Sequence, residues 1–406
     1  MIKIKKILIV SECFYPEEFK INDVALAWKD QGLEVSVLTL SPTYPRGKVF
    51  AGYKNPFFYK EKFEQITVYR VRAITGYRDS FFKKVLRFIN FMLLGSIVAV
   101  FIGRKYDYVF GFNTGALTSM MPAVLINKMY KKPLMFWVQD VWPESLYAFG
   151  LTKNKVTSYL LDSFVRNMHK GVSSIAISGR GFEEKLRPYV KNDLDFLYLP
   201  NWADNLDMDM PPAILSAEKL VHFTFAGNVG KQQNLENIII AFCAMPHEYQ
   251  HQSQLNIIGD GAKVDDLKLL SSSHPNIIFH GKKKRETMSA FYVASDFLIV
   301  SLVDEPIFSI TVPAKTQTYI AAKKPILAII NGDTADLVSD YKLGLHAHPS
   351  DIGGITRLFQ DCIEMDSNER DKFISESDYL LNTIFNKEKC INTLLEGLIG
   401  TNNGAQ

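Results

Sequence analysis

The sequence predicts an α/β protein made of two Rossmann-like domains, each a doubly wound parallel sheet, facing each other across a cleft. Its 406 residues are too many for one ordinary core and suit two. Short apolar runs rich in Val, Ile and Phe alternate with helical patterns, as strands buried between two helical layers do. The alternation breaks once, after Pro200, in a stretch with a proline pair and four acidic residues. We therefore expect domains over 1–203 and 204–379, with a C-terminal helix, about 380–400, packing back on the first.

The expected strands follow in chain order. Those of the first domain are 6–10, 34–40, 106–112, 134–138, 174–178 and 196–200. Those of the second domain are 221–227, 255–261, 276–281, 296–302 and 325–330. Each run is mostly apolar on both faces, and their alternation with helical patterns predicts parallel sheets. Such sheets bind ligands at the carboxyl ends of their strands, so the turns after these runs are the expected sites.

Composition sets broad limits on the class of protein. Hydrophobic residues make up 47% and charged residues 22%, which is typical of a folded globular protein and excludes a disordered chain. The four cysteines are far apart and form no CxxC pair, which predicts neither a zinc site nor a disulfide framework and favours the cytoplasm. The net charge of +3 argues neither for nor against a polyanionic partner, and we expect no nucleic acid.

Residues 88–103 are strongly apolar and have cations on both sides. Sixteen residues fall short of the roughly 20 that span a bilayer. Three interpretations remain open: a buried core helix, a helix that also touches an anionic membrane surface, and a true span. In the second interpretation the protein is peripheral on the cytoplasmic face of the inner membrane. The headgroups would then face the cations Lys83, Lys84, Arg87, Arg104 and Lys105.

Glycine-bearing turns follow three expected strands of the second domain. Glycines let backbone amides approach an anion, and a helix that follows adds unpaired N–H groups and a favourable dipole. FAGNVGKQQN leads into a helical pattern near Asn234, although a tight strand-to-helix connection would look the same. IIGDG repeats the arrangement, and HGKKKR places four cations after a strand end, a run that is also typical of a solvated surface. These turns contribute the candidate donor-binding residues Gly227, Asn228, Gly230, Lys231, Gly259, Gly281 and Lys282.

Residues 308–313 are an expected irregular loop that ends where Pro313 opens a helix. Small side chains at Ser309 and Thr311 would let backbone amides meet a diphosphate at this helix start. Lys315 lies within the first turn, close enough to reach the same anion. A cation and amides can stabilise the charge that develops on a leaving diphosphate, so we expect no metal ion and no cofactor.

The order of these segments resembles the retaining glycosyltransferases of family 4, whose two Rossmann-like domains form the GT-B arrangement. Among them it is most similar to the L-fucosamine (L-FucNAc) transferases of O-antigen, capsule and colanic acid assembly. The resemblance covers almost the full length and rests on FYPEEFKINDVA, SPTYPRGKVFAGY, VQDVWPESL, LPNWAD, FAGNVG, IIGDG, SDFLIVSL and VPAKTQTYIAAKKPILAIINGDTADLV. VQDVWPES together with TYPRGKVFAGY is a specific combination.

The resemblance implies where the substrates bind. The donor nucleotide would lie in the second domain, with its base near Gly281 and Lys282 and its phosphates near the turn after 221–227. The acceptor would lie in the first domain, near the candidate residues Glu17, Lys20, Asn22, Tyr44 and Arg46. Asp140 falls where the family places a polar residue close to the reacting sugar, and with Glu144 and Lys315 it is a candidate catalytic residue. From the residues alone, Asp140 is more typical of a helix N-cap, a role that could coexist with the first, and the acceptor loops could be plain polar loops.

The sequence departs from the family pattern at two places. Many members carry two glutamates eight positions apart in the donor loop, which here correspond to Ile310 and Thr318. The usual Arg/Lys pair on the phosphates corresponds to Asn228 and Gln233, whereas the lysine at Lys315 is kept. Ile310 and Thr318 remain candidate donor-binding residues by position.

The activity that the resemblance implies is transfer of a sugar from a UDP-sugar, such as an N-acetylated deoxyhexosamine, with retention of configuration. The acceptor would be an undecaprenyl-diphosphate-linked saccharide. Asp140 would orient the acceptor hydroxyl or stabilise positive charge at the sugar carbon. Two other functions remain open: a nucleotide-sugar epimerase of the same fold, and a catalytically inert, nucleotide-binding partner of another transferase, which the departures motivate.

Overall fold

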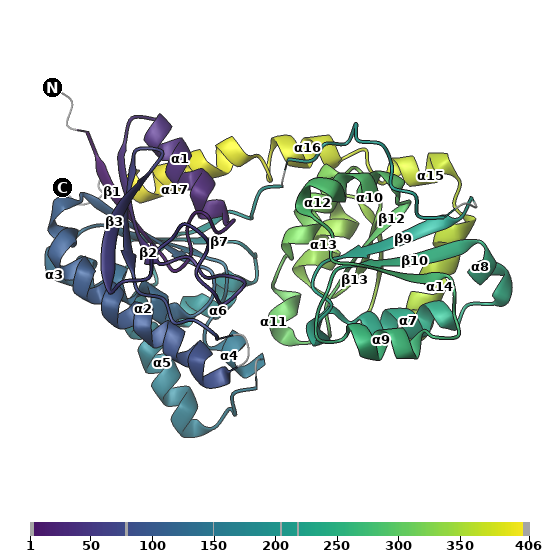
Figure 1. Cartoon of the computed structure of the whole chain (residues 1–406), viewed down its shortest axis with the longest axis horizontal. Helices are drawn as coiled ribbons and strands as arrows, with labels where there is room; N and C mark the ends of the chain where they lie inside the picture. Colours follow the sequence, from purple (N-terminus) through teal and green to yellow (C-terminus); the bar gives the residue numbers. More distant parts are fainter. Residues whose placement is uncertain (1–3, 78–79, 149, 204, 217–218, 401–406) are drawn as a thin grey trace. The chain divides into compact units, whose positions relative to one another are not determined.

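The computed structural model describes residues 4–77, 80–148, 150–203, 205–216 and 219–400. The chain forms two compact units, one of Met1–Leu199 with Glu388–Gln406 and one of Pro200–Lys387. Each unit is built on its own sheet with helices on both faces (Figure 1). The chain leaves the first unit after the last strand of its sheet and returns to it with the last helix.

The first unit holds an eight-stranded sheet in the order β3-β4-β2-β1-β5-β6-β7-β8. Its strands are β1 (Lys6–Ser11), β2 (Glu34–Leu40), β3 (Phe58–Phe63), β4 (Ile66–Val71), β5 (Tyr108–Asn113), β6 (Leu134–Val138), β7 (Ser174–Ile177) and β8 (Phe196–Tyr198). All neighbours pair parallel except β3 and β4, which form an antiparallel hairpin at the edge. The sequence analysis predicts neither strand of this hairpin, and the other strands of the sheet are parallel as expected. The β3 sequence FYKEKF alternates exposed and half-buried side chains, a pattern that is typical of an edge strand. It lacks the apolar run of a strand that is covered by helices on both faces.

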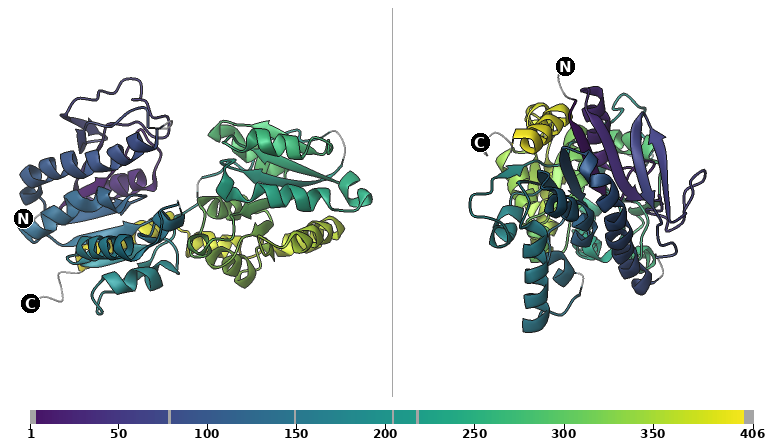
Figure 2. Two further views of the ribbon diagram at one scale, coloured as in Figure 1. Left: turned by 90° about the horizontal axis from the view of Figure 1, so that it is seen from below. Right: turned by 90° about the vertical axis from the view of Figure 1, so that its left-hand side faces the viewer.

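Helices cover both faces of this sheet (Figure 2). They are α1 (Lys20–Asp30), α2 (Phe81–Ile102), α3 (Met121–Tyr130), α4 (Glu144–Ala148), α5 (Lys155–His169), α6 (Phe182–Leu186) and α17 (Lys387–Gly400). α17 comes from the far end of the chain and lies beside α1, where the Trp28 indole N–H donates to the Ile391 carbonyl oxygen over 3.3 Å. The Ser174 hydroxyl at the start of β7 donates to the Gly397 carbonyl oxygen over 3.1 Å. The last helix is therefore part of the packing of the first unit.

α2 is longer than the apolar run that predicts it. It begins after Ser80, whose hydroxyl accepts the Lys83 backbone N–H over 3.3 Å as an N-cap. A Cβ atom on Gly95 would lie 2.9 Å from the ring of Pro122 in α3. Because Gly95 has no side chain, α2 can pack closely against α3. This contact attaches α2 to the first unit.

The second unit holds a six-stranded sheet in the order β11-β10-β9-β12-β13-β14, and all its neighbours pair parallel. Its strands are β9 (Val221–Ala226), β10 (Ser253–Ile258), β11 (Ile277–Gly281), β12 (Phe297–Ser301), β13 (Ile326–Ile329) and β14 (Gly344–Ala347). Five of them correspond to expected runs. β14 has the sequence GLHA, which is too short and too mixed to read as a strand from its pattern.

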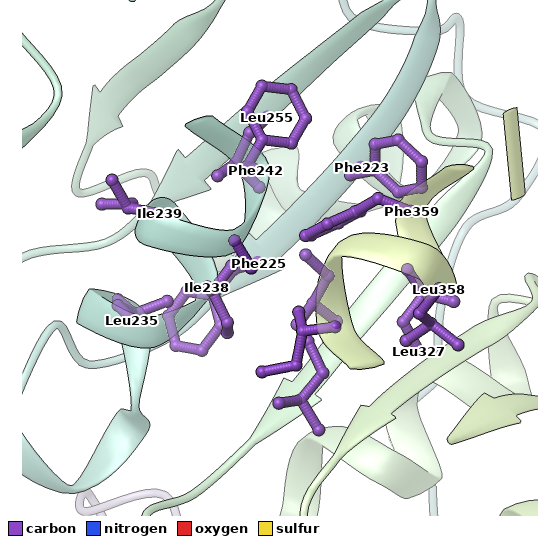
Figure 3. Close-up of a cluster of buried hydrophobic side chains, with 14 of the residues drawn as sticks. Phe223, Phe225, Leu235, Ile238, Ile239, Phe242, Leu255, Leu327, Leu358 and Phe359 are labelled. Atoms are coloured by element: carbon purple, nitrogen blue, oxygen red, sulfur yellow. The ribbon is translucent and has the colours of Figure 1, made fainter. Parts of the chain in front are cut away.

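The helices of the second unit are α7 (Leu235–Cys243), α8 (His247–His251), α9 (Val264–Leu270), α10 (Met288–Ala294), α11 (Pro306–Ser309), α12 (Ala314–Ala321), α13 (Asp333–Asp340), α14 (Ile352–Glu364), α15 (Ser367–Lys372) and α16 (Ser377–Asn382). Two apolar cores flank the sheet. In one, Phe223 packs edge-on against Phe359 of α14 with ring centroids 4.8 Å apart (Figure 3). The other lies under α12 and includes Leu298 and Tyr319. Because both faces are covered, the carboxyl edge of the sheet is where a ligand is expected.

Candidate functional site

The turns after β9, β10 and β11 lie in a row at the carboxyl edge of the second sheet. The Gly227 N–H donates to the Ile258 carbonyl oxygen over 2.9 Å, and the Gly259 N–H donates to the Gly281 carbonyl oxygen over 3.0 Å. A Cβ atom on Gly259, where φ is +145°, would lie 1.8 Å from the carbonyl oxygen of Gly227. The turns approach this closely because a glycine stands at that position.

Lys315 brings a cation to the first of these turns. It lies in the first turn of α12, and its Nζ donates to Gln233 Oε1 over 2.7 Å. Nζ also lies 3.7 Å from the centroid of the Phe225 ring. A Cβ atom on Gly227 would lie 3.1 Å from Nζ. The structure thus brings the predicted residues Gly227 and Lys315 together, with Gln233 as the side chain that holds the lysine.

The start of α12 adds backbone donors beside Lys315. The first N–H groups of an α-helix have no intrahelical acceptor, and the helix dipole favours an anion there. Pro313 is the N-cap residue of this helix. A helix start, a cation and a glycine turn together have the composition of a phosphate-binding site.

The predicted donor loop leads into this helix. The hydroxyls of Ser309 and Thr311 donate to carbonyl oxygens of their own turn, over 2.8 and 2.5 Å. Ile310 follows α11 as its C-cap residue. Thr318 lies one turn further along α12 and donates to a carbonyl oxygen of the preceding turn over 3.3 Å. These side chains stabilise the loop and the helix, so the loop can offer a ligand mainly its backbone.

The remaining predicted donor residues lie on the surface around the turns. Asn228, Lys231, Gly281 and Lys282 are exposed. A Cβ atom on Gly230 would lie 2.6 Å from Asn228 Nδ2, so a larger residue there would displace this amide. Their roles toward a donor stay predictions.

Binding of an anion at Lys315 is expected to weaken as the pH rises above about 7. Burial lowers the pKa of Lys315 to about 7, so the unliganded lysine loses its proton above that pH. A bound diphosphate favours the ammonium form, and binding must then take up a proton. The affinity for a diphosphate anion at this position should fall by up to about tenfold per pH unit above pH 7 and change little below it. Titration calorimetry in two buffers of different ionisation enthalpy measures the proton uptake. Lys315→Met should abolish the uptake, and an equal uptake in that variant would contradict this assignment.

Asp140 follows β6 at the carboxyl edge of the first sheet, where the Gln139 N–H donates to the Asn113 carbonyl oxygen over 2.8 Å. Burial raises the pKa of Asp140 to about 7. Burial also raises the pKa of Glu144. α4 begins at Glu144, so Asp140 is not its N-cap and that interpretation is wrong. A carboxyl group with a pKa near neutrality at this edge is a candidate for acid–base or charge-stabilising chemistry.

The expected acceptor loops follow β1 and β2 at the same edge, and Glu17 joins them. One of its carboxylate oxygens accepts the N–H groups of Thr43 and Tyr44 over 2.8 and 2.6 Å, and the other accepts that of Phe14 over 3.2 Å. The Asn22 side chain accepts a backbone N–H of the first loop over 3.0 Å. The structure therefore gives Glu17 and Asn22 a positioning role in the loops.

The other predicted acceptor residues lie nearer to solvent. Tyr44 is exposed, and its ring centroid lies 5.4 Å from that of Phe19. Arg46 is exposed and lies 5.6 Å from the centroid of the Phe50 ring. Lys20 is the first residue of α1. Tyr44 and Arg46 are thus the predicted side chains on these loops that a ligand can reach most directly.

A buried ion pair ties α2 to the loop after β1 and is not apparent from the sequence. Arg87 Nη2 lies 3.1 Å from Glu12 Oε1 and 3.5 Å from Cys13 Sγ. Burial raises the pKa of Glu12, and the arginine opposes this shift. The guanidinium also lies 4.7 Å from the centroid of the Tyr77 ring. Arg87 is therefore buried, and the interpretation that it faces lipid headgroups is wrong. The side chain of Lys84 lies outside the described residues.

Replacing Arg87 with methionine is expected to lower the free energy of unfolding by about 3–5 kcal/mol, because Glu12 is left buried without its counter-ion. Urea-induced unfolding followed by circular dichroism measures this change. Arg104→Met, at the exposed end of the same helical segment, is a matched control that should change it by less than about 0.5 kcal/mol. Similar losses in the two variants would contradict a special role for the buried pair.

Known proteins match this chain in sequence. Residues 209–378 match the family model described as glycosyl transferases group 1. The probable glycosyltransferase WbjE of Pseudomonas aeruginosa is 28% identical over 277 residues, which cover 65% of this chain and 68% of that protein. The putative colanic acid biosynthesis glycosyl transferase WcaI of Escherichia coli K12 is 24% identical over 227 residues, which cover 52% of this chain and 54% of that protein.

Solved structures match the fold over nearly the whole chain. Sucrose-phosphate synthase from Thermosynechococcus elongatus has a TM-score of 0.73 at 13% identity, covering 99% of this chain and 100% of that one. The Anabaena protein Alr3699/HepE, in complex with UDP and glucose, has a TM-score of 0.66 at 13% identity, covering 98% and 100%. The predicted fold class, two Rossmann-like parallel-sheet domains of the GT-B type, is confirmed. The residues that match the group 1 glycosyl transferases all lie within the second unit.

Proposed function

We propose that this chain is a glycosyltransferase that takes a sugar from a nucleotide donor whose diphosphate binds at Gly227 and Lys315. The observation that carries the proposal is the position of Lys315 Nζ against a glycine turn at the carboxyl edge of a parallel sheet. This position lies within the residues that match the group 1 glycosyl transferases. The names of WbjE and WcaI support transfer over epimerisation.

The proposed chemistry divides between two charged side chains. As the bond from the sugar carbon to the diphosphate breaks, negative charge grows on the phosphate oxygens. The Lys315 ammonium and the N–H groups at the start of α12 stabilise this charge. Positive charge grows at the sugar carbon, and the Asp140 carboxylate stabilises it or orients the acceptor hydroxyl. In the unliganded protein the pKa values of both groups lie at about 7, so Asp140 is mostly protonated below that pH and Lys315 is mostly neutral above it.

The proposal extends to the substrates. We propose a UDP-sugar as donor, such as one carrying an N-acetylated deoxyhexosamine (L-FucNAc), and transfer with retention onto an undecaprenyl-diphosphate-linked saccharide of O-antigen or capsule assembly. The sequence resemblance supports this choice, as does the name of WcaI, a relative placed in colanic acid biosynthesis. HepE, whose fold is similar, is in complex with UDP and glucose. The protein would then work at the cytoplasmic face of the inner membrane and need no metal ion.

A screen of UDP- and GDP-sugars tests the proposal by following nucleotide release with and without a lipid-diphosphate-linked sugar, in the presence of EDTA. We expect one UDP-sugar to release UDP only when the acceptor is present, at a rate that EDTA does not change. Nucleotide binding without turnover for every donor and acceptor pair would favour a catalytically inert partner of another transferase. The replacement of the acidic residues by Ile310 and Thr318 would then explain the missing turnover. Interconversion of donor sugars without acceptor would favour the epimerase. Activity that EDTA abolishes and a divalent cation restores would overturn metal independence alone.

A further inference from the structure

α2 presents an apolar stripe to solvent along its whole length. Its members are large side chains spaced three or four residues apart, and Leu93 and Phe101 are 54% and 77% exposed. The stripe runs for about 28 Å at 1.5 Å per residue. Contiguous apolar patches of this extent on a folded unit mark sites that bind a partner or a membrane. The α2 stripe consists of Phe82, Val85, Ile89, Leu93, Ile97 and Phe101.

The opposite face of the same helix is built into the first unit. Phe91, Val98 and Ile102 are buried there. α2 and α3 lie side by side in every view (Figures 1 and 2). Arg87 also lies on this face, paired with Glu12. One face of α2 therefore packs inside the first unit. The elements that pack against this face do not cover the opposite one.

These contacts show whether α2 is better suited to lie on a membrane surface or to cross the membrane. By length and composition the segment Val85–Lys105 could cross a bilayer, although about a third of its most apolar 18-residue stretch is buried in the unit. A crossing helix would leave Glu12 buried without its counter-ion and would take Phe91, Val98 and Ile102 out of the core of the first unit. A helix that lies in the plane of the surface keeps this ion pair and buries only its outer stripe. The structure therefore favours surface binding over a span.

The charges around the α2 stripe fit an anionic surface. α2 contains no Asp or Glu. Exposed cations stand at both ends, Lys83 near its start and Arg104 and Lys105 just beyond its last residue. Interfacial helices bind through buried apolar area together with attraction to anionic headgroups. Two copies of such a stripe packed against each other would instead bring like charges together.

We propose that the α2 stripe docks the first unit onto an anionic lipid bilayer, with α2 lying in the boundary between headgroups and acyl chains. Phe82, Leu93 and Phe101 enter the acyl region, and Arg104 and Lys105 contact the headgroups. This inference goes beyond the proposed transfer reaction, because docking needs neither donor nor acceptor. Through the pair of Arg87 and Glu12, the docked helix is connected to the loop that follows β1.

Cosedimentation of the full chain with phosphatidylcholine vesicles, with and without phosphatidylglycerol, tests the docking. We expect binding to the anionic vesicles, and a loss of at least about tenfold in partitioning for Leu93→Ser combined with Phe101→Ser. Arg104→Gln with Lys105→Gln should weaken binding to the anionic vesicles and leave binding to neutral ones unchanged. The matched control is Ile214→Ser with Leu269→Ser in the second unit, where these side chains are 92% and 77% exposed. Circular dichroism melting checks that each variant folds.

Three outcomes overturn the proposal. One is a wild-type chain that does not sediment with anionic vesicles. Another is equal partitioning of the stripe variant and the control variant. The third is a wild-type dimer, seen by sedimentation equilibrium, that the stripe variant dissociates while vesicle binding stays unchanged, because the stripe would then be a contact between copies. The vesicles contain no donor or acceptor, so a failure here leaves the proposed activity standing, and a failed donor screen leaves the docking standing.

Discussion

Replacement of Lys315 by methionine is expected to lower kcat/KM by about 10²–10³-fold. Methionine keeps an unbranched apolar stem of nearly the same length, but it removes the cation that faces the turn at Gly227. The diphosphate then loses a positive partner both in the bound donor and as negative charge grows on its oxygens. Initial rates of nucleotide release with the donor that the screen identifies, together with the Kd for UDP, measure both effects.

The fold should survive this change. Burial lowers the pKa of Lys315 to about 7, which shows that the charged form is unfavourable where it lies. Below pH 7 the folded chain carries that unfavourable charge. As the pH rises toward 10.5, the ordinary pKa of lysine, the loss of stability caused by the charge disappears. Lys315→Met should therefore raise the melting temperature most below about pH 7. Lys372→Met, on the exposed surface of α15, is the control and should leave both rate and stability unchanged. A Lys315→Met enzyme with nearly full activity would exclude this residue from the donor site.

Asp140→Asn is expected to lower kcat by at least about 10²-fold while the Kd for the donor stays nearly unchanged. The amide keeps the shape of the carboxyl group but can neither carry its negative charge nor accept a proton. The donor diphosphate is proposed to bind in the second unit, so its affinity should not depend on this residue. Steady-state kinetics and donor titration separate the two quantities. Asp30→Asn, at the exposed end of α1, is the matched control. Equal effects on kcat and on donor affinity would argue for a structural role.

The pH dependence of Asp140 has a defined sign. Its pKa of about 7 lies above the ordinary value of 3.8, so the folded state holds this proton more tightly than the unfolded state does. In the wild type, kcat should fall about tenfold per pH unit below pH 7 as the carboxylate is protonated, and Asp140→Asn should lose this dependence. Because of the same shift, ionisation of the Asp140 carboxyl group lowers the stability of the folded state. The variant should melt higher than the wild type above pH 7 and at about the same temperature near pH 4.

The arrangement of the second unit could be predicted well because its signals are local. Five of its strands are short apolar runs, and the turns after β9, β10 and β11 carry glycines that the backbone requires. The edge strand β3 and the strand β14 were not predicted because neither has an apolar run, and β4 was missed because Thr67 and Arg70 interrupt its apolar residues. Their place in the sheets depends on neighbouring strands that supply hydrogen-bond partners.

The candidate site was predictable in its residue types more than in its contacts. The sequence places Lys315 after a loop and a proline, which is enough to predict a cation at a helix start. It does not show that Gln233, 82 positions earlier, holds the amine over 2.7 Å. Glu17 and Asn22 look like free polar residues in the sequence, whereas in the structure their side chains accept backbone N–H groups of the acceptor loops.

The sequence by itself determined the fold class, the strands that are continuous apolar runs and the turns in which glycines let amides approach an anion. These features depend on residues that are neighbours along the chain, through hydrophobic periodicity and backbone conformation. Only the tertiary structure decided that Arg87 pairs with Glu12, that Asp140 and Lys315 have pKa values of about 7, and that α2 leaves one face uncovered. Each of these depends on burial by distant segments, and the free energy of a charge or an apolar side chain is set by what packs around it.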